Sequence, residues 1–250
     1  MLNTAFTFIR SILFYIGYFI ATVIISLLII SSFWFIPLKR RYFLYAGWCR
    51  FVLWWLRVTC GVRYDIQGKE NIPQTAVVTL STHQSAWETI FLYDAVSPVC
   101  PILKKELLSI PFWGWAMSVQ MPIAIDRSKP REAGRTLLIQ GRQRLSNGLN
   151  VVIFPEGSRS PAGMVKPMSK GGAKLAVTAN VPVLPVIHNA GECWPAHTMM
   201  KRAGTIRLRF GIPIDVIGKS ANEVAEAYTQ WVADNIDIIS NAPLSGPETH

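Results

Sequence analysis

Charged residues are scarce in this chain: Asp, Glu, Lys and Arg together make up 16% of its 250 residues, against about a quarter in an ordinary soluble domain. Half of the residues are hydrophobic and nine are tryptophan, a balance that suits a protein with part of its surface in lipid. The four cysteines have no CxxC or metal-ligand spacing, so we expect buried reduced thiols and no disulfide framework. His188 and His197 fit no standard zinc site, and we interpret them as core or loop histidines.

The charges that are present are mostly positive, giving a formal net charge of +10. Such an excess indicates anionic partners, but no segment carries a dense basic stripe and no recognised nucleic-acid module is present. We therefore expect no nucleic-acid partner and attribute the charge to an anionic membrane surface and phosphorylated substrates. No resident cofactor or metal is expected. The length allows one α/β domain plus an appendage.

The longest hydrophobic run lies near the N-terminus. From Ser11 to Leu38 there are 28 positions without a charged residue, which extend about 42 Å as a helix against a hydrocarbon core of about 30 Å. No small-residue cleavage site follows, so we interpret the run as an uncleaved membrane anchor. Three basic residues follow it at 39–41 and only Arg10 precedes it. The positive-inside rule then places the rest of the chain on the cytoplasmic face of the inner membrane.

The next segment, Tyr42 to Cys60, is apolar and aromatic, with Arg50 and Arg57 seven positions apart. This pattern favours a helix in the headgroup plane, with the arginines at lipid phosphates and the tryptophans at the interface. A helix packed on the domain fits the same pattern. We therefore divide the chain into an N-terminal membrane helix pair (1–60), a main domain (61–240) and a mobile tail (241–250).

Strands and helices alternate through the main domain, which predicts a mostly parallel α/β sheet wrapped by helices. A capping box at Ser220 and Glu223 marks the start of the last helix, which we expect to reach Ile239. The other expected helices are Gln84–Ala95, Pro111–Ser118, Pro130–Leu145 and Lys170–Thr178, and the expected strands are Val62–Ile66, Thr75–Leu80, Pro101–Leu103, Met121–Ile125, Leu149–Phe154, Val181–His188 and an edge strand at Thr205–Phe210.

His83 and Glu88 are the first candidates for chemistry, five positions apart in Ser-Thr-His-Gln-Ser-Ala-Trp-Glu. A histidine that removes a proton from an alcohol needs a carboxylate behind it, which fixes its tautomer and stabilises the imidazolium. On one continuous helix these side chains would point about 140° apart, so His83 must lie before or at the helix start, with Glu88 on the second turn. His83 is then expected at the edge of the sheet where open α/β sheets bind ligands. The alternative is a helix-capping histidine beside an ordinary first-turn acid.

About seventy residues later, positions 154–160 read Phe-Pro-Glu-Gly-Ser-Arg-Ser, a glycine-opened loop of the kind that holds a phosphate. Arg159 is the first candidate ligand because a guanidinium can donate two parallel hydrogen bonds to a phosphate. A solvated surface charge is the alternative for this arginine. The Gly171-Gly172 pair before the next helix either directs backbone amides at an anion or forms a plain tight turn.

Taken in order, these segments resemble the phospholipid/glycerol acyltransferase family, specifically its bacterial 1-acyl-sn-glycerol-3-phosphate acyltransferases, over about residues 60–215. The segments that carry the resemblance are the histidine-x4-acid box at 83–88, Pro-Ile-Ala-Ile-Asp-Arg at 122–127, Phe-Pro-Glu-Gly-Ser-Arg at 154–159, Val-Pro-Val-Leu-Pro-Val at 181–186, and Lys-Lys-Glu-Leu at 104–107 with Pro-Phe-Trp-Gly-Trp at 111–115. There are three departures: Glu88 replaces the family's usual aspartate, Thr82 its usual asparagine and Ser158 its usual threonine. The longer glutamate can still reach the imidazole with another rotamer, so we expect the activity to be kept and the surrounding geometry to differ.

The resemblance implies a glycerolphosphate-acyltransferase-like fold, with residues 61–240 as the acyltransferase domain. It also implies acyl transfer from acyl-CoA or acyl-carrier protein to the sn-2 hydroxyl of lysophosphatidate, with His83 as general base oriented by Glu88. The substrate-binding residues that it implies are Arg159, Arg127, Lys105, Glu156, Gly157 and Ser158, where Glu156 contacts substrate or braces its loop. Membrane lipids are the other expected partners, because similar bacterial enzymes carry an N-terminal two-helix motif that docks on one leaflet.

Three other functions are compatible with the same segments. The first is an acyltransferase with a different acceptor, such as glycerol-3-phosphate or a lyso-aminolipid. The second is a non-catalytic membrane protein that binds or transfers lipid. The third is a thioesterase, which releases thiol without needing a lyso-acceptor.

Overall fold

The computed structural model describes residues 2–126 and 128–239, so Arg127 and the predicted tail 241–250 lie outside the described residues. The α-helices are α1 (Leu2–Ser31), α2 (Leu38–Cys60), α3 (Trp87–Ala95), α4 (Trp113–Ser118), α5 (Pro130–Ser146), α6 (Gly171–Ala179), α7 (Ala190–Cys193) and α8 (Ala221–Ile239), with 3₁₀ turns η1 (Ser32–Trp34), η2 (Lys69–Asn71) and η3 (Lys105–Ser109). The strands are β1 (Val62–Gln67), β2 (Val78–Ser81), β3 (Val99–Cys100), β4 (Ile102–Lys104), β5 (Ile123–Ile125), β6 (Asn150–Ile153), β7 (Val183–His188) and β8 (Gly204–Phe210).

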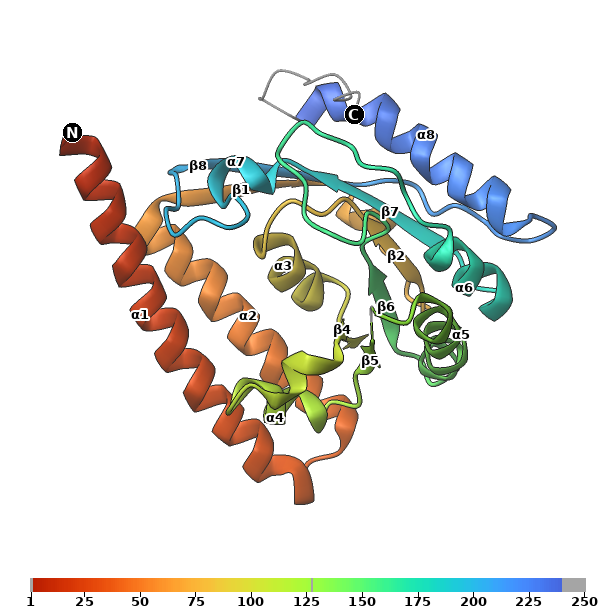
Figure 1. Cartoon of the computed structure of the whole chain (residues 1–250), viewed down its shortest axis with the longest axis horizontal. Helices are drawn as coiled ribbons and strands as arrows, with labels where there is room; N and C mark the ends of the chain where they lie inside the picture. Colours follow the sequence, from red (N-terminus) through yellow and green to blue (C-terminus); the bar gives the residue numbers. More distant parts are fainter. Residues whose placement is uncertain (1, 127, 240–250) are drawn as a thin grey trace.

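The main sheet has six strands in the order β1-β8-β7-β2-β6-β3 (Figure 1). Neighbours run parallel except β7 and β8, which are antiparallel. Strands β4 and β5 form a separate parallel pair. The predicted mostly parallel sheet wrapped by helices is therefore confirmed.

One strand prediction is wrong. Strand β8 was expected at an edge, but β1 pairs along its outer side from Val62↔Gly204 to Gln67↔Arg209. The polar-apolar alternation of β8 indicates one buried and one exposed face. An interior strand near the rim of a sheet can have the same two faces as an edge strand, so the alternation does not distinguish the two positions.

Helices cover both faces of the sheet, with a hydrophobic core on each. Consecutive residues of β7 point to opposite sides: Val183 packs in the core under α5, α6 and α8, and Leu184 packs in the core under α1, α2 and α3. Leu175 of α6 belongs to the first core and Trp87 of α3 to the second. Strands that are buried on both sides explain the nearly continuous apolar runs in the sequence.

The N-terminal hydrophobic run is not one helix from Ser11 to Leu38. Helix α1 starts at Leu2, includes Arg10, and ends at Ser31 before a short turn, and Pro37 precedes α2. Among the residues that the structure describes, one segment is long and apolar enough to cross a membrane, Thr4–Trp34, with a mean hydropathy of 2.5. Only 22% of its most apolar window is buried, so most of this surface has no protein cover.

Helix α2 packs on the domain with one face and exposes apolar side chains on the other. Val52 and Leu56 are fully buried, whereas Phe43 and Trp54 are more than half exposed. Arg50, expected at lipid phosphates, donates to Asp94 of α3 with an Nε–Oδ1 distance of 2.8 Å, and its side chain is 64% exposed. The basic run 39–41 is also partly engaged, because Arg41 is buried and donates to the carbonyl of Val119.

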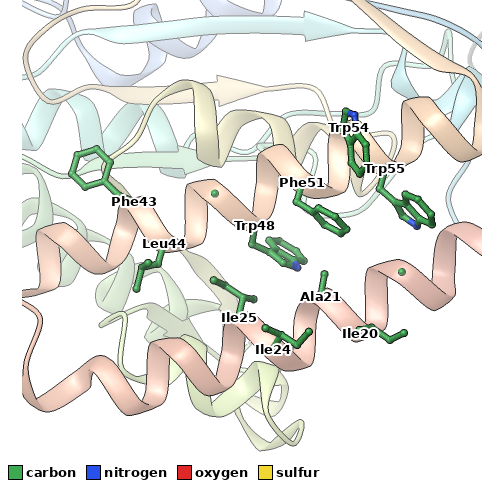
Figure 2. A pocket seen from close by; sticks show the side chains of 12 residues that line it. Ile20, Ala21, Ile24, Ile25, Phe43, Leu44, Trp48, Phe51, Trp54 and Trp55 are labelled. Carbon is green, nitrogen blue, oxygen red and sulfur yellow. The ribbon is translucent and has the colours of Figure 1, made fainter.

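Between α1 and α2 lies an apolar groove of about 720 Å³ (Figure 2). Ile20 and Ile24 of α1 line one side, and Trp48 and Phe51 of α2 line the other. No charged side chain is among its lining residues in the described part of the chain. The groove therefore offers apolar contact without any group that could carry out chemistry.

Candidate active site

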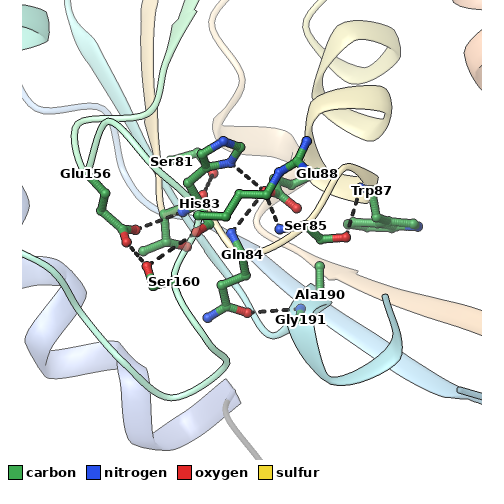
Figure 3. Close-up of polar contacts among 12 residues, drawn as sticks. Ser81, His83, Gln84, Ser85, Trp87, Glu88, Glu156, Ser160, Ala190 and Gly191 are labelled. Carbon is green, nitrogen blue, oxygen red and sulfur yellow. Dashed lines mark hydrogen bonds and ion pairs between the residues drawn. The ribbon is translucent and has the colours of Figure 1, made fainter. Parts of the chain in front are cut away.

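Three neighbouring strands deliver the candidate residues to one edge of the main sheet. Strands β7, β2 and β6 run parallel, so their C-terminal ends lie together. Beyond β2 comes His83, at the end of β7 is His188, and directly after β6 begins the loop 154–160. Segments about seventy and one hundred residues apart in sequence thus meet at the place that the sequence predicted for His83 (Figure 3).

His83 and Glu88 are in contact. The chain from Thr82 to Ala86 is not helical, and α3 begins at Trp87, so the imidazole folds back over the start of the helix. The distance from His83 Nδ1 to Glu88 Oε1 is 2.8 Å. Glu88 lies in the first turn of α3 and not in the second as predicted. Because Nδ1 is engaged by the carboxylate, Nε2 is the ring nitrogen available to a substrate.

The Glu88 carboxylate is completely buried. Its Oε1 also accepts hydrogen bonds from the backbone N–H groups of Gln84 at 3.0 Å and Ser85 at 2.8 Å. Burial alone raises the pKa of Glu88, but the imidazoles of His188 and His83 and the hydrogen bonds from His83 and Ser85 outweigh it and hold the pKa below its usual value. The group is therefore a carboxylate at neutral pH, as the orientation of a histidine base requires.

Glu156 holds the loop 154–160 against the backbone of His83. Its Oε1 accepts the N–H of His83 at 2.8 Å, and its Oε2 accepts the hydroxyl of Ser160. The N–H of Ser160 in turn donates to the carbonyl of His83 at 2.8 Å. Burial raises the pKa of Glu156. Of the two roles open from the sequence, this geometry is that of a brace.

The imidazole of His83 lies in a pocket of about 460 Å³, here called the histidine pocket. Phe154 stacks on the ring with a centroid distance of 4.1 Å and an interplanar angle of 17°, which leaves 14% of the His83 side chain exposed. The apolar side of the pocket includes Tyr45 of α2 and Trp113 of α4. The imidazole is therefore accessible but partly enclosed by aromatic side chains.

Among the described residues, Arg159 and Lys104 are the arginine and lysine side chains that line the histidine pocket. Lys105, which the sequence analysis selected, is exposed at the start of η3 and is not among the lining residues. The sequence-based prediction therefore missed Lys104 as a pocket residue, although it stands beside Lys105 in the same segment. It also missed His197, which lines the pocket from the loop after α7.

The other loop candidates lie at the rim of the pocket. Gly157, with a φ of +71°, and Ser158 both line it and are exposed. The Ser158 hydroxyl accepts a hydrogen bond from Lys166 at 3.1 Å. Arg159 additionally lines a cavity of about 550 Å³ that Arg202 also lines, and another of about 410 Å³, so it borders three cavities.

Metal chemistry has no evident site in the described ranges. Within residues 2–126 and 128–239, no group of three His, Cys, Asp or Glu side chains is placed to hold a metal ion. The four cysteines are buried free thiols. The chemistry available here is that of a carboxylate-oriented imidazole beside cationic side chains.

Known proteins match both the sequence and the fold. The Acyltransferase family matches residues 63–189. The chain is 44% identical over 209 residues to the 1-acyl-sn-glycerol-3-phosphate acyltransferase of Pseudomonas aeruginosa, covering 82% of this chain and 81% of that protein. It is 30% identical over 202 residues to the protein of the same name from Saccharomyces cerevisiae, covering 78% of this chain and 66% of that protein.

A solved structure has the same fold. The 1-acyl-sn-glycerophosphate (LPA) acyltransferase PlsC of Thermotoga maritima superposes with a TM-score of 0.74, covering 91% of this chain and 96% of that one, at 22% identity. The sequence matches extend across the segments that carry His83, Glu88 and Arg159. The chain therefore belongs to the acyltransferase family.

Proposed function

We propose that this enzyme transfers an acyl chain from acyl-CoA or acyl-carrier protein to the sn-2 hydroxyl of lysophosphatidate, giving phosphatidate. The observation that carries the proposal is the 2.8 Å contact between His83 Nδ1 and Glu88 Oε1 in a pocket that also holds Arg159. The names of the Pseudomonas and yeast relatives support lysophosphatidate as the acceptor.

The chemistry needs one proton acceptor and an activated donor. His83 Nε2 takes the proton of the acceptor hydroxyl as its oxygen forms a bond to the thioester carbonyl carbon. Glu88 stabilises the imidazolium that results. The tetrahedral intermediate then collapses, the carbon–sulfur bond breaks, and the leaving thiolate takes the proton back from His83. No covalent enzyme intermediate is required because the thioester is already activated.

The acceptor phosphate is held by cations at the rim of the histidine pocket. In this proposal Arg159 donates two hydrogen bonds to it, and Lys104, which lines the same pocket, adds a second positive charge. Arg127 is a further ligand in this proposal, and Lys105 is the alternative to Lys104. Binding the phosphate orients the hydroxyl toward His83, which lowers the entropic cost of the reaction.

The membrane places the enzyme beside its lipid substrate. We assign the chain to the cytoplasmic face of the inner membrane, with α1 and the exposed side of α2 in contact with lipid. The membrane-length Thr4–Trp34 segment, the exposed Phe43 and Trp54, and the apolar groove between the helices support this assignment. Carbonate extraction of membranes and protease access from each side of inverted vesicles test it.

The decisive assay is acyl transfer by purified enzyme in mixed micelles, with wild type compared to His83→Ala. We expect wild type to acylate lysophosphatidate and His83→Ala to lose on the order of 10²- to 10⁴-fold in kcat. Glycerol-3-phosphate and a lyso-aminolipid in the same assay identify the acceptor, and acyl-CoA against acyl-carrier protein identifies the donor. Thiol release that is independent of acceptor would indicate a thioesterase, and equal activity of the two proteins would exclude His83 as the base.

A further inference from the structure

His188, which the proposed reaction does not use, lies directly behind the catalytic pair. It is the last residue of β7 and is 1% exposed. Its Nδ1 accepts the backbone N–H of Ala190 at 3.2 Å. Its Nε2 lies 2.9 Å from the carbonyl oxygen of Thr82 and must donate to it. The ring is therefore neutral with its proton on Nε2, and burial lowers the pKa of His188 in keeping with this.

The second oxygen of Glu88 points to the same histidine. While Oε1 accepts three hydrogen bonds, Oε2 is buried and has no hydrogen-bond partner among the described residues. The Nε2 atom of His188 lies 4.0 Å from Glu88 Oε2. A buried carboxylate oxygen without a partner is costly, and the Nε2–H of His188, which donates to the Thr82 carbonyl, is the N–H dipole that lies 4.0 Å from it.

We propose that His188 is a positioning residue for the acyl transfer site, acting through Glu88. Its Nε2–H stabilises the carboxylate as an anion and fixes the Thr82 carbonyl, one residue before the base. Glu88 must stay ionised while His83 becomes an imidazolium, because a carboxylate that took the Nδ1 proton would leave the base without compensation. This inference rests on the proposed function.

Three substitutions distinguish the contributions of the two ring nitrogens of His188. Alanine removes both. Glutamine places an amide N–H about as far out as Nε2, whereas the amide of asparagine extends only about as far as Nδ1. We expect His188→Ala and His188→Asn to lower kcat by about 10- to 100-fold, the size of effect seen when partners that orient metal-bound imidazoles are removed, and His188→Gln to recover most of it. The KM for lysophosphatidate should not change, so kcat and kcat/KM fall together.

A double-mutant cycle tells positioning from a merely structural role. In a Glu88→Gln background, the carboxylate charge that His188 is proposed to stabilise is absent. If His188 acts through that charge, His188→Ala costs no more than about twofold further there, whereas independent effects would multiply. Equal fold losses in the two backgrounds, or unchanged kcat in His188→Ala alone, overturn the inference.

Failure of the proposed function looks different. A wild type without acyl transfer, or a fully active His83→Ala, removes the proposed function itself. An active wild type, an inactive His83→Ala and a fully active His188→Ala remove only the role of His188. Thermal unfolding in detergent checks that each variant folds.

A measurement on the wild type covers the case in which the variants do not fold. The chain has four histidines, so ¹⁵N-histidine NMR in micelles, assigned with His83→Ala, His197→Ala and His250→Ala, can report the state of His188. We expect a neutral ring with its proton on Nε2 at pH 7. An imidazolium, or a proton on Nδ1, contradicts the inference.

Discussion

Glu156 Oε1 accepts a hydrogen bond from the backbone N–H of His83 at 2.8 Å, across 73 positions of sequence. The N–H of Ser160, four residues further along the same loop, donates to the carbonyl of His83. The loop that carries Arg159 is thus fastened to the backbone of His83 through both the N–H and the carbonyl of that residue. The distance between the proposed phosphate ligand and the proposed base is therefore set through the backbone.

Glu156→Ala should reduce both stability and activity. It leaves the N–H of His83 without its acceptor, which costs about 1–3 kcal/mol for a buried group, and a 1 Å displacement of the base costs on the order of 100-fold in kcat. Glu156→Gln keeps an acceptor oxygen and should retain most of both. The measurements are thermal unfolding and kcat with lysophosphatidate. A stable Glu156→Gln protein as inactive as Glu156→Ala would mean that the charge, and not the brace, matters.

Lys104 and Lys105 form a matched pair because they are adjacent and equally charged. Lys104, at the end of β4, lines the histidine pocket, whereas Lys105 does not. Lys104→Ala should raise the KM for lysophosphatidate by roughly 10- to 100-fold, the value of a charge-assisted hydrogen bond, and Lys105→Ala should leave it within about twofold of wild type. Monoacylglycerol, which lacks the phosphate, is the control acceptor. The reverse ranking would restore the sequence-based choice of Lys105.

Features of this protein that depend on neighbouring residues were predictable from the sequence. The break before α3 follows from the spacing of His83 and Glu88, since one helix cannot bring them together. The start of α8 follows from the capping box, in which the N–H of Ser220 donates to Glu223 at 2.7 Å and the N–H of Glu223 donates back to Ser220. Both arguments use contacts within five positions along the chain.

Features that depend on distant contacts were not predictable. The interior position of β8 depends on its pairing with β1, about 140 residues away. The partner of His188 is the same kind of case, because Thr82 is 106 positions distant. Which of two adjacent lysines enters a pocket depends on the direction in which β4 ends. Composition and periodicity carry no record of these relationships.

Gly172 allows α6 to lie against the sheet. A Cβ at this position would come within 2.5 Å of Leu80 Cδ2 in β2, so Gly172→Ala should lower the free energy of unfolding by about 1–3 kcal/mol through overpacking. Gly134 in α5 is the matched control: a Cβ there meets nothing within 4 Å, and Gly134→Ala should stabilise by about 0.4–1 kcal/mol. Denaturant unfolding measures both. A Gly172→Ala protein of normal stability but with a raised KM for lysophosphatidate would instead favour the role of an amide at an anion.

Lys201 joins helix α1 to the loop that carries His197. It is 1% exposed, and its ammonium donates to the Tyr15 hydroxyl of α1 at 2.8 Å and to the carbonyls of Thr198 at 3.1 Å and Met199 at 3.0 Å. Burial lowers the pKa of Lys201 from its usual 10.5 to about 8. The charged form is therefore less favourable in the folded protein than in the unfolded chain.

Stability should consequently rise with pH in a defined window. Between about pH 8 and pH 10.5 the unfolded chain still holds a proton on this lysine that the folded protein has released, so raising the pH through this range favours folding. The Tm of wild type minus the Tm of Lys201→Met should increase from pH 8 to pH 10, as measured by thermal unfolding in detergent. Lys174→Met, which removes an exposed lysine of α6, controls for the loss of one charge. A difference for Lys201→Met that stays constant or shrinks over that range would show that this lysine is fully solvated in the folded protein.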